Sequence, residues 1–451
     1  MILKMPAYRL KSAYLPQGWT RDAVITVSDR GFITSIEPGP FPPSGAGGIE
    51  SIDALVVPGM PNAHSHAFQR GMAGAAEYRA SARDSFWTWR EAMYALANRI
   101  EPDDLRIIAT QLFIEMLKAG YTSVAEFHYL HRPPAMWQAI DAAADETGIG
   151  LTLLPTLYQS SDFGPKPLRA EQARFHMELD SFLRGIQGYS GRHRIGAAFH
   201  SLRAVPLDVL KEATLALRAI DDAMPVHIHI AEQMLEVRSC LEATGRRPIE
   251  LLLDQGLITP QWCLVHATHA TQSELKGVAR SGAAVCVSIS TEANLGDGFF
   301  DGGRFLRVNG RLCIGSDSQA TVSPAEELRW LEYQQRLKKK RRGVLAAKTE
   351  SHVGTRLWTE AVQTGARALA NNAGGIAVGA RADWLVLDPA HPALAGAAAE
   401  STLDRLIFAG AAAAIRDVMV AGRWVIKDRR HPIEDEASQR YAALMRRLAS
   451  A

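Results

Sequence analysis

Two histidines near the start of the chain are spaced in a way that suits a shared metal ion. His64 and His66 form a His-Ser-His sequence shortly after the apolar residues 55–57. An extended chain alternates its side chains, so both imidazoles point to the same side. The chain contains 14 histidines, and neighbouring histidines are commonly solvent-exposed or structural. This pair alone therefore suggests a metal site without establishing one.

Three more metal-binding side chains stand at the ends of apolar segments. His229 ends the segment 226–230, His266 ends the segment 264–266, and Asp317 follows the segment 312–315. In a barrel of parallel strands, the carboxyl ends of the strands meet at one mouth, which carries the chemistry. We therefore predict one metal site, held by four ligands: His64, His66, His229 and Asp317. Three nitrogens and one oxygen suit zinc, and iron or another divalent ion could occupy the same place.

The same strand ends supply groups that could move protons. A divalent ion lowers the pKa of a bound water towards neutrality and so generates hydroxide. Glu232 lies three residues beyond His229, where it could carry a proton between that water and a leaving group. We interpret His266 as a base or as a group that polarises the substrate, and not as a fifth ligand. The sequence leaves open which of Glu232, His266 and Asp317 takes the first proton.

The elements that must position these residues follow a repeating pattern. Short apolar segments alternate with amphipathic ones, which is typical of a parallel sheet with helices between its strands. Eight such strands separated by helices favour a (β/α)8 TIM barrel over a doubly wound sheet, and the absence of a glycine-rich turn after the first strand also weakens the dinucleotide-binding alternative. Helices are predicted at 102–119 and 324–339, and strands at 54–58, 122–129, 150–158, 194–200, 226–230, 263–266, 284–288 and 312–315.

Both ends of the chain predict a second, smaller unit. Alternating apolar residues at 23–27 and 32–36 predict strands, and the same alternating pattern recurs at 383–387 and 418–426. The two sets of strands could pair with each other. We predict a small β-sandwich made from residues 1–57 and 373–451, the latter with a terminal helix, around a barrel over residues 58–372.

Composition and charge narrow the class of protein. The 451 residues are 47% hydrophobic and 22% charged, as in soluble globular proteins. Lys and Arg total 50 against 48 for Asp and Glu, so no broad positive field favours nucleic acid. The basic residues 336–342 are interpreted as the solvated end of a helix.

Cysteine usage and the lack of long apolar segments indicate the cellular compartment in which we expect the protein. The four cysteines form no CxxC motif and read as reduced core thiols. No stretch of 18 apolar residues lacks a charge, and no basic segment precedes an apolar one at the N-terminus. We expect a cytoplasmic homodimer with neither a membrane nor a nucleic-acid partner.

The ligand pattern, with histidines after the first, fifth and sixth strands and Asp317 after the eighth, resembles the amidohydrolase superfamily. The predicted satellite is similar to the small β-sandwich of that superfamily. Binuclear members place a carbamylated lysine at the end of the fourth strand, whereas His200 and Ser201 stand there in this chain. The resemblance therefore implies the mononuclear deaminase branch, with one ion per chain.

A narrower resemblance covers the chain nearly end to end. Residues 58–74 (PGMPNAHSHAFQRGMAG), 86–90, 126–129, 200–205, 227–233 and 291–298 resemble N-formimino-L-glutamate deiminases. Many members of that family continue Tyr-x-His-His-Asp after the second strand, whereas residues 129–133 are Tyr-Leu-His-Arg-Pro here. This departure leaves the role of the following loop open and touches no ligand.

The resemblance implies a hydrolase that converts N-formimino-L-glutamate to N-formyl-L-glutamate and ammonia in histidine degradation. The alternative is another aminohydrolase of the same branch, similar to a guanine or cytosine deaminase. A different class, a non-catalytic barrel used as a scaffold, is disfavoured because every ligand position and Glu232 are intact.

The proposed substrate carries two carboxylates beside its amidine, so its pocket must supply fixed cations. Arg203 follows the fourth strand and Tyr129 ends the second, and guanidinium groups bind carboxylates with two parallel hydrogen bonds. Arg90 lies in the insertion after the first strand, from which it could close over the mouth, and Gln69 could bind the substrate from the first loop. These four residues favour a small anionic amidine over a neutral purine or pyrimidine.

Overall fold

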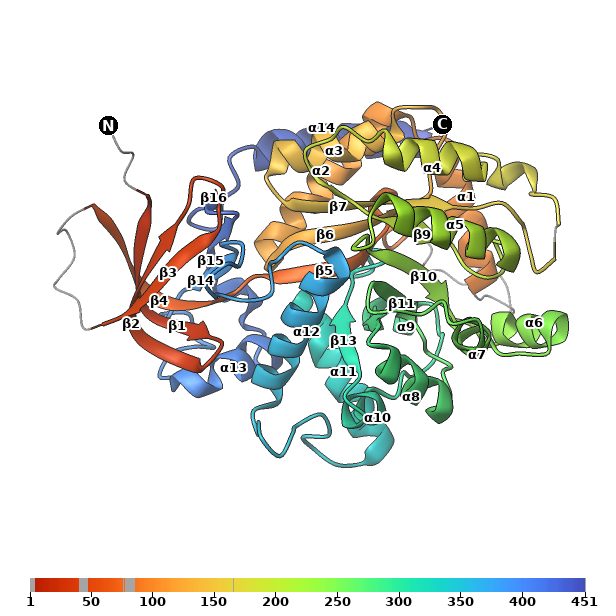
Figure 1. Ribbon diagram of the computed structural model, residues 1–451. Coiled ribbons are helices and arrows are strands. Elements are labelled where there is room, and N and C mark those ends of the chain that lie inside the picture. The colour runs from red at the N-terminus through yellow and green to blue at the C-terminus, as the bar shows by residue number, and fades with distance from the viewer. Residues whose placement is uncertain (1–4, 40–47, 76, 78–85, 165, 451) are drawn as a thin grey trace.

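The computed structural model describes residues 5–39, 48–75, 77, 86–164 and 166–450. Its larger part is a barrel of parallel strands joined in the order β13-β12-β11-β10-β9-β7-β6-β5, with β8 (Arg194–Ile195) paired to β7. The strands are β5 (Met60–Ser65), β6 (Tyr121–His128), β7 (Gly150–Leu157), β9 (Ala197–Phe199), β10 (Val226–Ile230), β11 (Trp262–His266), β12 (Ala284–Val287) and β13 (Arg311–Ile314). The (β/α)8 architecture predicted from the sequence is confirmed (Figure 1).

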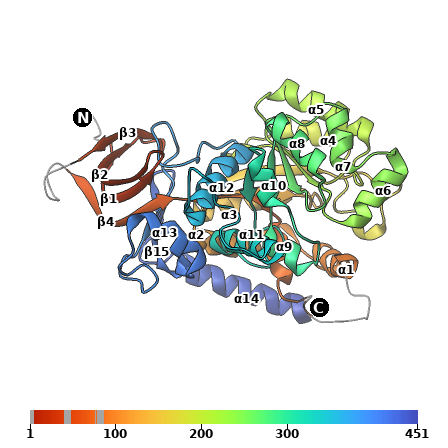
Figure 2. The ribbon, with the colours of Figure 1, turned by 90° about the horizontal axis from the view of Figure 1, so that it is seen from below.

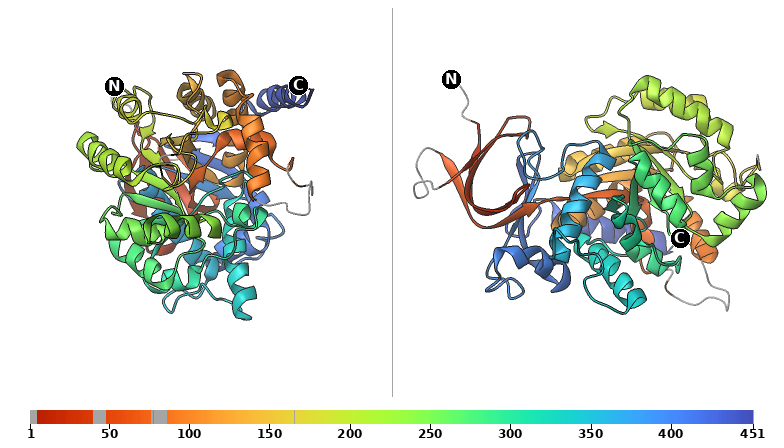
Figure 3. Two further views of the ribbon diagram at one scale, coloured as in Figure 1. Left: turned by 90° about the vertical axis from the view of Figure 1, so that its right-hand side faces the viewer. Right: turned by 60° about the horizontal axis from the view of Figure 1, so that its bottom comes forward.

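Helices surround this barrel (Figure 3). They are α2 (Pro102–Ala119), α3 (Met136–Thr147), α4 (Leu179–Gln187), α5 (Leu207–Ile220), α6 (Met234–Thr244), α7 (Pro248–Asp254), α8 (Gln272–Ser281), α9 (Ile289–Asn294), α10 (Gly302–Arg307), α11 (Pro324–Lys339) and α12 (Val353–Leu369). The bounds of α2 and α11 are those predicted. Both helices begin with a proline in their first turn, and α2 ends at Gly120, whose φ of 104° is the left-handed cap that glycine favours. None of the described helices is both long and apolar enough to span a bilayer.

The two ends of the chain form a second sheet, in the order β16-β15-β14-β4-β1-β2-β3. Its N-terminal strands are β1 (Ala7–Leu15), β2 (Gly18–Val27), β3 (Ile33–Pro38) and β4 (Ile49–Pro58), and its C-terminal strands are β14 (Trp384–Leu387), β15 (Ile415–Val420) and β16 (Arg423–Ile426). The antiparallel pairing of β4 with β14 joins the two sets. The strands curve around their own apolar core, which includes Leu10, Ile25, Val56 and Trp384. The expected pairing of the two chain ends is confirmed.

The prediction for the first barrel strand was wrong. Residues 54–58 belong to β4 in the small sheet, and the barrel begins at Met60, after the single residue Gly59. A Cβ at Gly59 would lie 2.2 Å from the Thr122 side chain, so only glycine allows the chain to pass from one sheet to the other here. The two strands follow each other without a polar turn, and their apolar residues therefore form one run in the sequence.

The terminal helix α14 (Glu434–Ser450) packs against the barrel alongside α2 (Figure 2). Arg440 forms an ion pair of 2.6 Å with Glu146, and the Tyr441 hydroxyl donates to the Arg70 carbonyl at 3.1 Å. Arg447 forms a further ion pair with Asp104 on α2. The short helices η3 (Ala399–Ser401), α13 (Thr402–Phe408) and η4 (Ala411–Ala414) connect β14 to β15.

The barrel closes where its first and last strands meet. Ser65 and Asp317 form a parallel bridge, in which His66 N donates to Asp317 O at 3.0 Å and Asp317 N donates to His64 O at 3.0 Å. Asn62 adds two contacts with Ser316: its Nδ2 lies 2.7 Å from Ser316 Oγ, and its Oδ1 accepts from Ser316 N at 3.0 Å. Because β5 starts at the small sheet, the carboxyl ends of the strands open on the opposite side of the barrel (Figure 1).

Candidate active site

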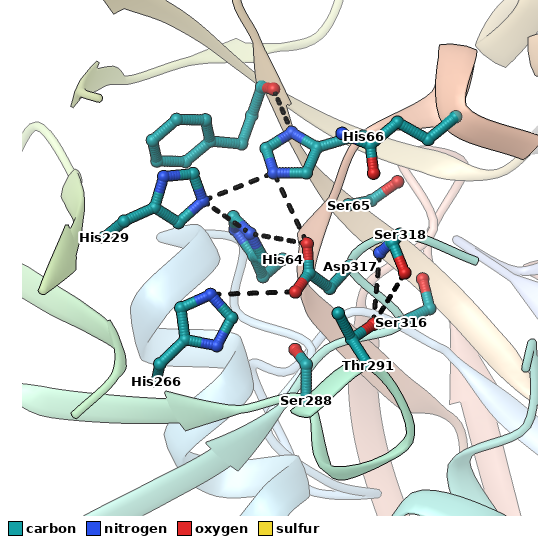
Figure 4. Close-up of polar contacts among 12 residues, drawn as sticks. His64, Ser65, His66, His229, His266, Ser288, Thr291, Ser316, Asp317 and Ser318 are labelled. Carbon is teal, nitrogen blue, oxygen red and sulfur yellow. Dashed lines mark hydrogen bonds and ion pairs between the residues drawn. The ribbon is translucent and has the colours of Figure 1, made fainter. Parts of the chain in front are cut away.

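Four side chains from three strand ends converge at the mouth of the barrel (Figure 4). His229 Nε2 lies 3.1 Å from His64 Nε2 and 3.3 Å from His66 Nε2, and Asp317 Oδ1 lies 3.3 and 3.4 Å from the same two atoms. Ligands about 2.0–2.1 Å from a tetrahedral zinc are about 3.3 Å apart. The four distances match that spacing, and the three histidine nitrogens form a group able to hold a metal ion. These residues therefore fit a divalent ion, and they are the four side chains that the sequence analysis proposes as its ligands.

Burial keeps the three imidazoles in the neutral form that binds metals. Burial lowers the pKa of His64 and His229, and it lowers the pKa of His66 to about 3 together with the neighbouring His64. His66 Nδ1 lies 2.8 Å from the Phe127 carbonyl, to which it donates. That bond fixes the tautomer and leaves Nε2 with a lone pair directed at the other ligands. The His64 charge and hydrogen bond hold the pKa of Asp317 below its usual range against the effect of burial.

A buried carboxylate on β6 holds the end of β5, where the first two histidines lie. Glu126 accepts hydrogen bonds from Ala67 N at 2.6 Å and from Ser65 Oγ at 2.7 Å. Gln319 Nε2 donates to Ser65 Oγ at 3.1 Å and to Asp317 O at 2.6 Å. This network joins the second strand to the ends of the first and eighth strands, around the candidate metal-binding side chains. Burial raises the pKa of Glu126 to about 8.

Beside the ligands lie the groups predicted to move protons. His266 Nε2 is 3.8 Å from Glu232 Oε1 and 3.7 Å from Asp317 Oδ2. Burial raises the pKa of Glu232 to about 7, opposed by the charge of His266. Burial alone would lower the pKa of His266, but Glu232, Glu292 and Asp317 together raise it well above its ordinary value. A carboxyl that titrates near neutrality suits a general acid and base.

The structure gives His266 a carboxylate partner that is not visible in the sequence. Glu292 Oε1 lies 3.3 Å from His266 Nδ1 and accepts from Ser288 N at 3.1 Å. The Glu292 side chain is 2% exposed. It comes from α9, 26 residues beyond His266, so nothing local in the sequence pairs the two. Glu292 contacts the Nδ1 side of the imidazole, whereas Glu232 and Asp317 lie on its Nε2 side, so the carboxylate of Glu292 fixes the orientation of the ring.

A cavity opens from these groups. All four residues predicted to bind the substrate line it: Gln69, Arg90, Tyr129 and Arg203. Gln69 Nε2 donates to the Tyr129 hydroxyl at 2.7 Å, and the Tyr129 ring lies 4.9 Å from the His66 ring. Arg203 Nη1 donates to the Ser161 carbonyl at 3.0 Å. Arg90 lies on α1 (Phe86–Ala97), where burial lowers its pKa and the charge of Arg203 lowers it further.

Sequence reasoning missed the other polar side chains around this cavity. Tyr94 and Tyr158 face the two arginines, and His200 lies 5.1 Å, ring to ring, from His229. His200 was noted in the sequence only as the residue standing where a bridging lysine would be. Tyr158 follows β7 directly, so its place at a strand end was the available signal. Tyr94 sits in a helix, where nothing in its spacing indicates a binding role.

Comparisons with known proteins identify similar chains. A model described as the amidohydrolase family matches residues 55–425. The chain is 46% identical to a formimidoylglutamate deiminase from Pseudomonas aeruginosa, over 98% of this chain and 100% of that protein. An amidohydrolase from Brucella melitensis has a TM-score of 0.91 and 39% identity, covering 98% of this chain and 100% of that one. An adenosine deaminase from Xanthomonas campestris, solved with bound zinc, has a TM-score of 0.81 over 99% of both chains. At 21% identity, it shares the fold alone.

Proposed function

The chain belongs to the amidohydrolase family, and from that premise we propose that it hydrolyses N-formimino-L-glutamate to N-formyl-L-glutamate and ammonia. The observation that carries this proposal is one cavity in which a metal-binding cluster faces two arginines, Arg90 and Arg203. The 46% identity to a formimidoylglutamate deiminase along the full chain supports the choice of substrate. We place the reaction in histidine degradation.

We propose that His64, His66, His229 and Asp317 hold one divalent ion, and that this ion is zinc, with iron as the alternative. The chemistry such an ion supplies is Lewis acidity, which makes water nucleophilic near neutral pH. The donor set of three nitrogens and one oxygen suits this role. The homodimer stays a prediction from the sequence, which sedimentation of the purified protein would test.

The side chains around the cluster divide the proton transfers between them. Water adds to the formimino carbon, the bond from that carbon to the terminal nitrogen breaks, and ammonia leaves. Glu232 accepts a proton from the attacking water and delivers it to the departing nitrogen. His266, held by Glu292, donates a hydrogen bond towards the reacting centre, and Asp317 lies close enough to share protons with it.

The opposite end of the cavity binds the anionic part of the substrate. Gln69 and Tyr129 adjoin His66, and Arg90 and Arg203 supply two positive charges. An anion that enters between two half-buried guanidinium groups relieves their mutual repulsion. This charge balance favours an acidic amidine over a neutral nucleobase.

Release of ammonia from N-formimino-L-glutamate is the direct test of this proposal. The purified chain is expected to form one ammonia and one N-formyl-L-glutamate per substrate consumed. A coupled ammonia assay and mass spectrometry of the product measure both quantities. Guanine and cytosine serve as comparison substrates, and faster turnover of either one would overturn the assignment.

Replacement of Arg203 or Arg90 by methionine is expected to weaken substrate binding while the metal site stays assembled. A hydrogen bond to a charged group contributes about 1.5–3 kcal/mol, so kcat/KM should fall at least about tenfold for each variant. We expect Arg203→Met to have the more reproducible effect, since Arg203 follows a barrel strand whereas Arg90 lies in an insertion. Steady-state kinetics and metal content measure the two effects separately.

Arg218→Met, on the exposed face of α5, is the matched control for both variants. It removes the same charge at a distance from the cavity and should leave kcat/KM unchanged. Parent-like kinetics of Arg203→Met and Arg90→Met with this dicarboxylate would remove the physical support for an acidic substrate.

A further inference from the structure

The cavity contains two tyrosine hydroxyls that both accept hydrogen bonds from one buried amide. Tyr94, on α1, and Tyr158, directly after β7, both line the cavity and are at most 3% exposed. Between them lies Gln172 at the end of η2 (Ala170–Gln172), itself 1% exposed. Gln172 Nε2 donates to the Tyr158 hydroxyl at 2.7 Å and to the Tyr94 hydroxyl at 3.2 Å. One buried amide therefore connects the two phenols.

The orientation of that amide follows from its other end. Gln172 Oε1 accepts from the backbone N–H of Arg169 at 3.0 Å. The reversed amide would point NH2 at this N–H and leave two donors facing each other. The carbonyl oxygen therefore faces Arg169, and both N–H groups of the amide face the phenols.

The charged neighbours of the phenols can only donate as well. Arg203 interacts electrostatically with Tyr158, and the Arg169 guanidinium lies over the Tyr94 ring, 5.2 Å from its centroid. A guanidinium can only donate, and a hydroxyl carries one proton and two lone pairs. Each phenol thus accepts from Gln172 and keeps its own proton to give away. Among the described residues, neither hydroxyl has an acceptor for that proton.

The positions of the phenols indicate which part of the substrate they meet. Tyr129 lies directly against the His66 ring, at 4.9 Å, whereas Tyr158 is separated from the ligands by His200. The Tyr158 ring is 4.6 Å from the His200 ring, which is 5.1 Å from the His229 ring. The formimino group must sit at the ligands, so the phenols lie one ring further along the cavity. That is the place of the side-chain carboxylate and not of the α-carboxylate.

We propose that Tyr158 and Tyr94 donate their hydroxyl protons to the side-chain carboxylate of the substrate, and that Gln172 is the positioning residue that directs both protons into the cavity. The proposal rests on the proposed function, because it assumes an acidic amidine. Together with Arg203 and Arg90, the two tyrosines present only hydrogen-bond donors to the substrate at this end of the cavity. Such a site accepts a carboxylate and disfavours an amide, whose NH2 would meet only other donors.

The test uses Tyr158→Phe, which removes one hydroxyl and keeps the ring. With N-formimino-L-glutamate, KM should rise about tenfold while kcat stays within about threefold, since the carboxylate is bound equally before and during the reaction. With N-formimino-L-norvaline, whose side chain ends in a methyl group, parent and variant should perform alike. With N-formimino-4-aminobutyrate, which lacks only the α-carboxylate, the tenfold difference should return.

A second variant, Gln172→Glu, reverses the hydrogen bonds at nearly constant shape. A carboxylate at this position would still accept from Arg169 N, but it would also draw the protons of both phenols away from the cavity. Its KM for N-formimino-L-glutamate should rise more than that of Tyr158→Phe, with little further loss on the norvaline analogue. Tyr333→Phe on α11 is the matched control and should behave as the parent.

The parent enzyme is measured first on N-formimino-L-glutamate, so that two failures stay separate. No ammonia from the parent overturns the proposed function. An active parent with unchanged KM in Tyr158→Phe, or an equal loss on the glutamate and norvaline substrates, overturns the role of the phenols alone. If Tyr158→Phe does not fold, as judged by circular dichroism, Tyr94→Phe provides the same comparison of substrates.

Discussion

Replacement of Glu232 by glutamine is expected to lower kcat by about 10²–10⁴-fold, the usual contribution of a positioned proton-transfer group. The amide keeps the size of the side chain but cannot take up and return a proton. Burial places the pKa of Glu232 at about 7 in the folded protein, so the native carboxyl can do both near neutral pH. The rate should fall without a matching rise in KM, because the lost interaction belongs to the transition state.

Metal content separates this effect from damage to the ligands. Glu232 touches His266 at 3.8 Å and is not one of the four converging ligands, so Glu232→Gln should bind as much metal as the parent. Glu242→Gln, on the exposed surface of α6, is the matched control and should keep full activity. Turnover of Glu232→Gln within a few-fold of the parent would exclude Glu232 from the mechanism.

Removal of the metal is expected to abolish turnover, and the active protein is expected to hold about one divalent ion per chain. The three histidine nitrogens lie together, with Asp317 Oδ1 3.3 Å from His64 Nε2, and His200 follows the fourth strand, with no lysine there to bridge a second ion. Elemental analysis gives the stoichiometry. Dialysis against a chelator followed by addition of Zn²⁺ or Fe²⁺ measures loss and recovery of activity, and the better recovery identifies the preferred ion.

The chelated chain should remain folded, since the seam between β5 and β13 is closed by hydrogen bonds that do not involve the ion. Ser65, Asn62 and Gln319 supply these bonds together with the backbone. Circular dichroism before and after chelation tests this expectation. Two ions per active chain, or full activity without any, would contradict the mononuclear site.

The sequence indicated the proposed metal cluster because its side chains stand near strand ends, and strand ends in a barrel have a fixed location. His229 lies near the end of β10, Asp317 follows β13, and His266, proposed as a base, ends β11, so their convergence required only the correct architecture. The first strand was misplaced because β4 and β5 are separated by Gly59 alone. A passage between two sheets leaves no polar turn for pattern analysis to detect.

The supporting residues could not be predicted in the same way. Glu292 meets His266 from the helix α9, and Gln172 meets Tyr94 across 78 residues. Their roles depend on which atoms face one another, and periodicity carries no information about that. Tyr158 was the exception in principle, since it ends a strand, but a tyrosine there is as compatible with packing as with binding.

The seam at Ser65 and Asp317 also bears on the order in which the site arises during synthesis. Asp317 follows the last barrel strand, about 250 residues after His64, so a ribosome must complete most of the chain before the fourth ligand exists. A nascent chain that ends before β13 carries its histidines without their carboxylate and without the bridge that brings strands one and eight together. Closing so long a loop is entropically unfavourable until the intervening strands have paired. Acquisition of the ion should therefore be a late event, coupled to completion of the barrel, and a truncated translation product should compete poorly for the cell's metal supply.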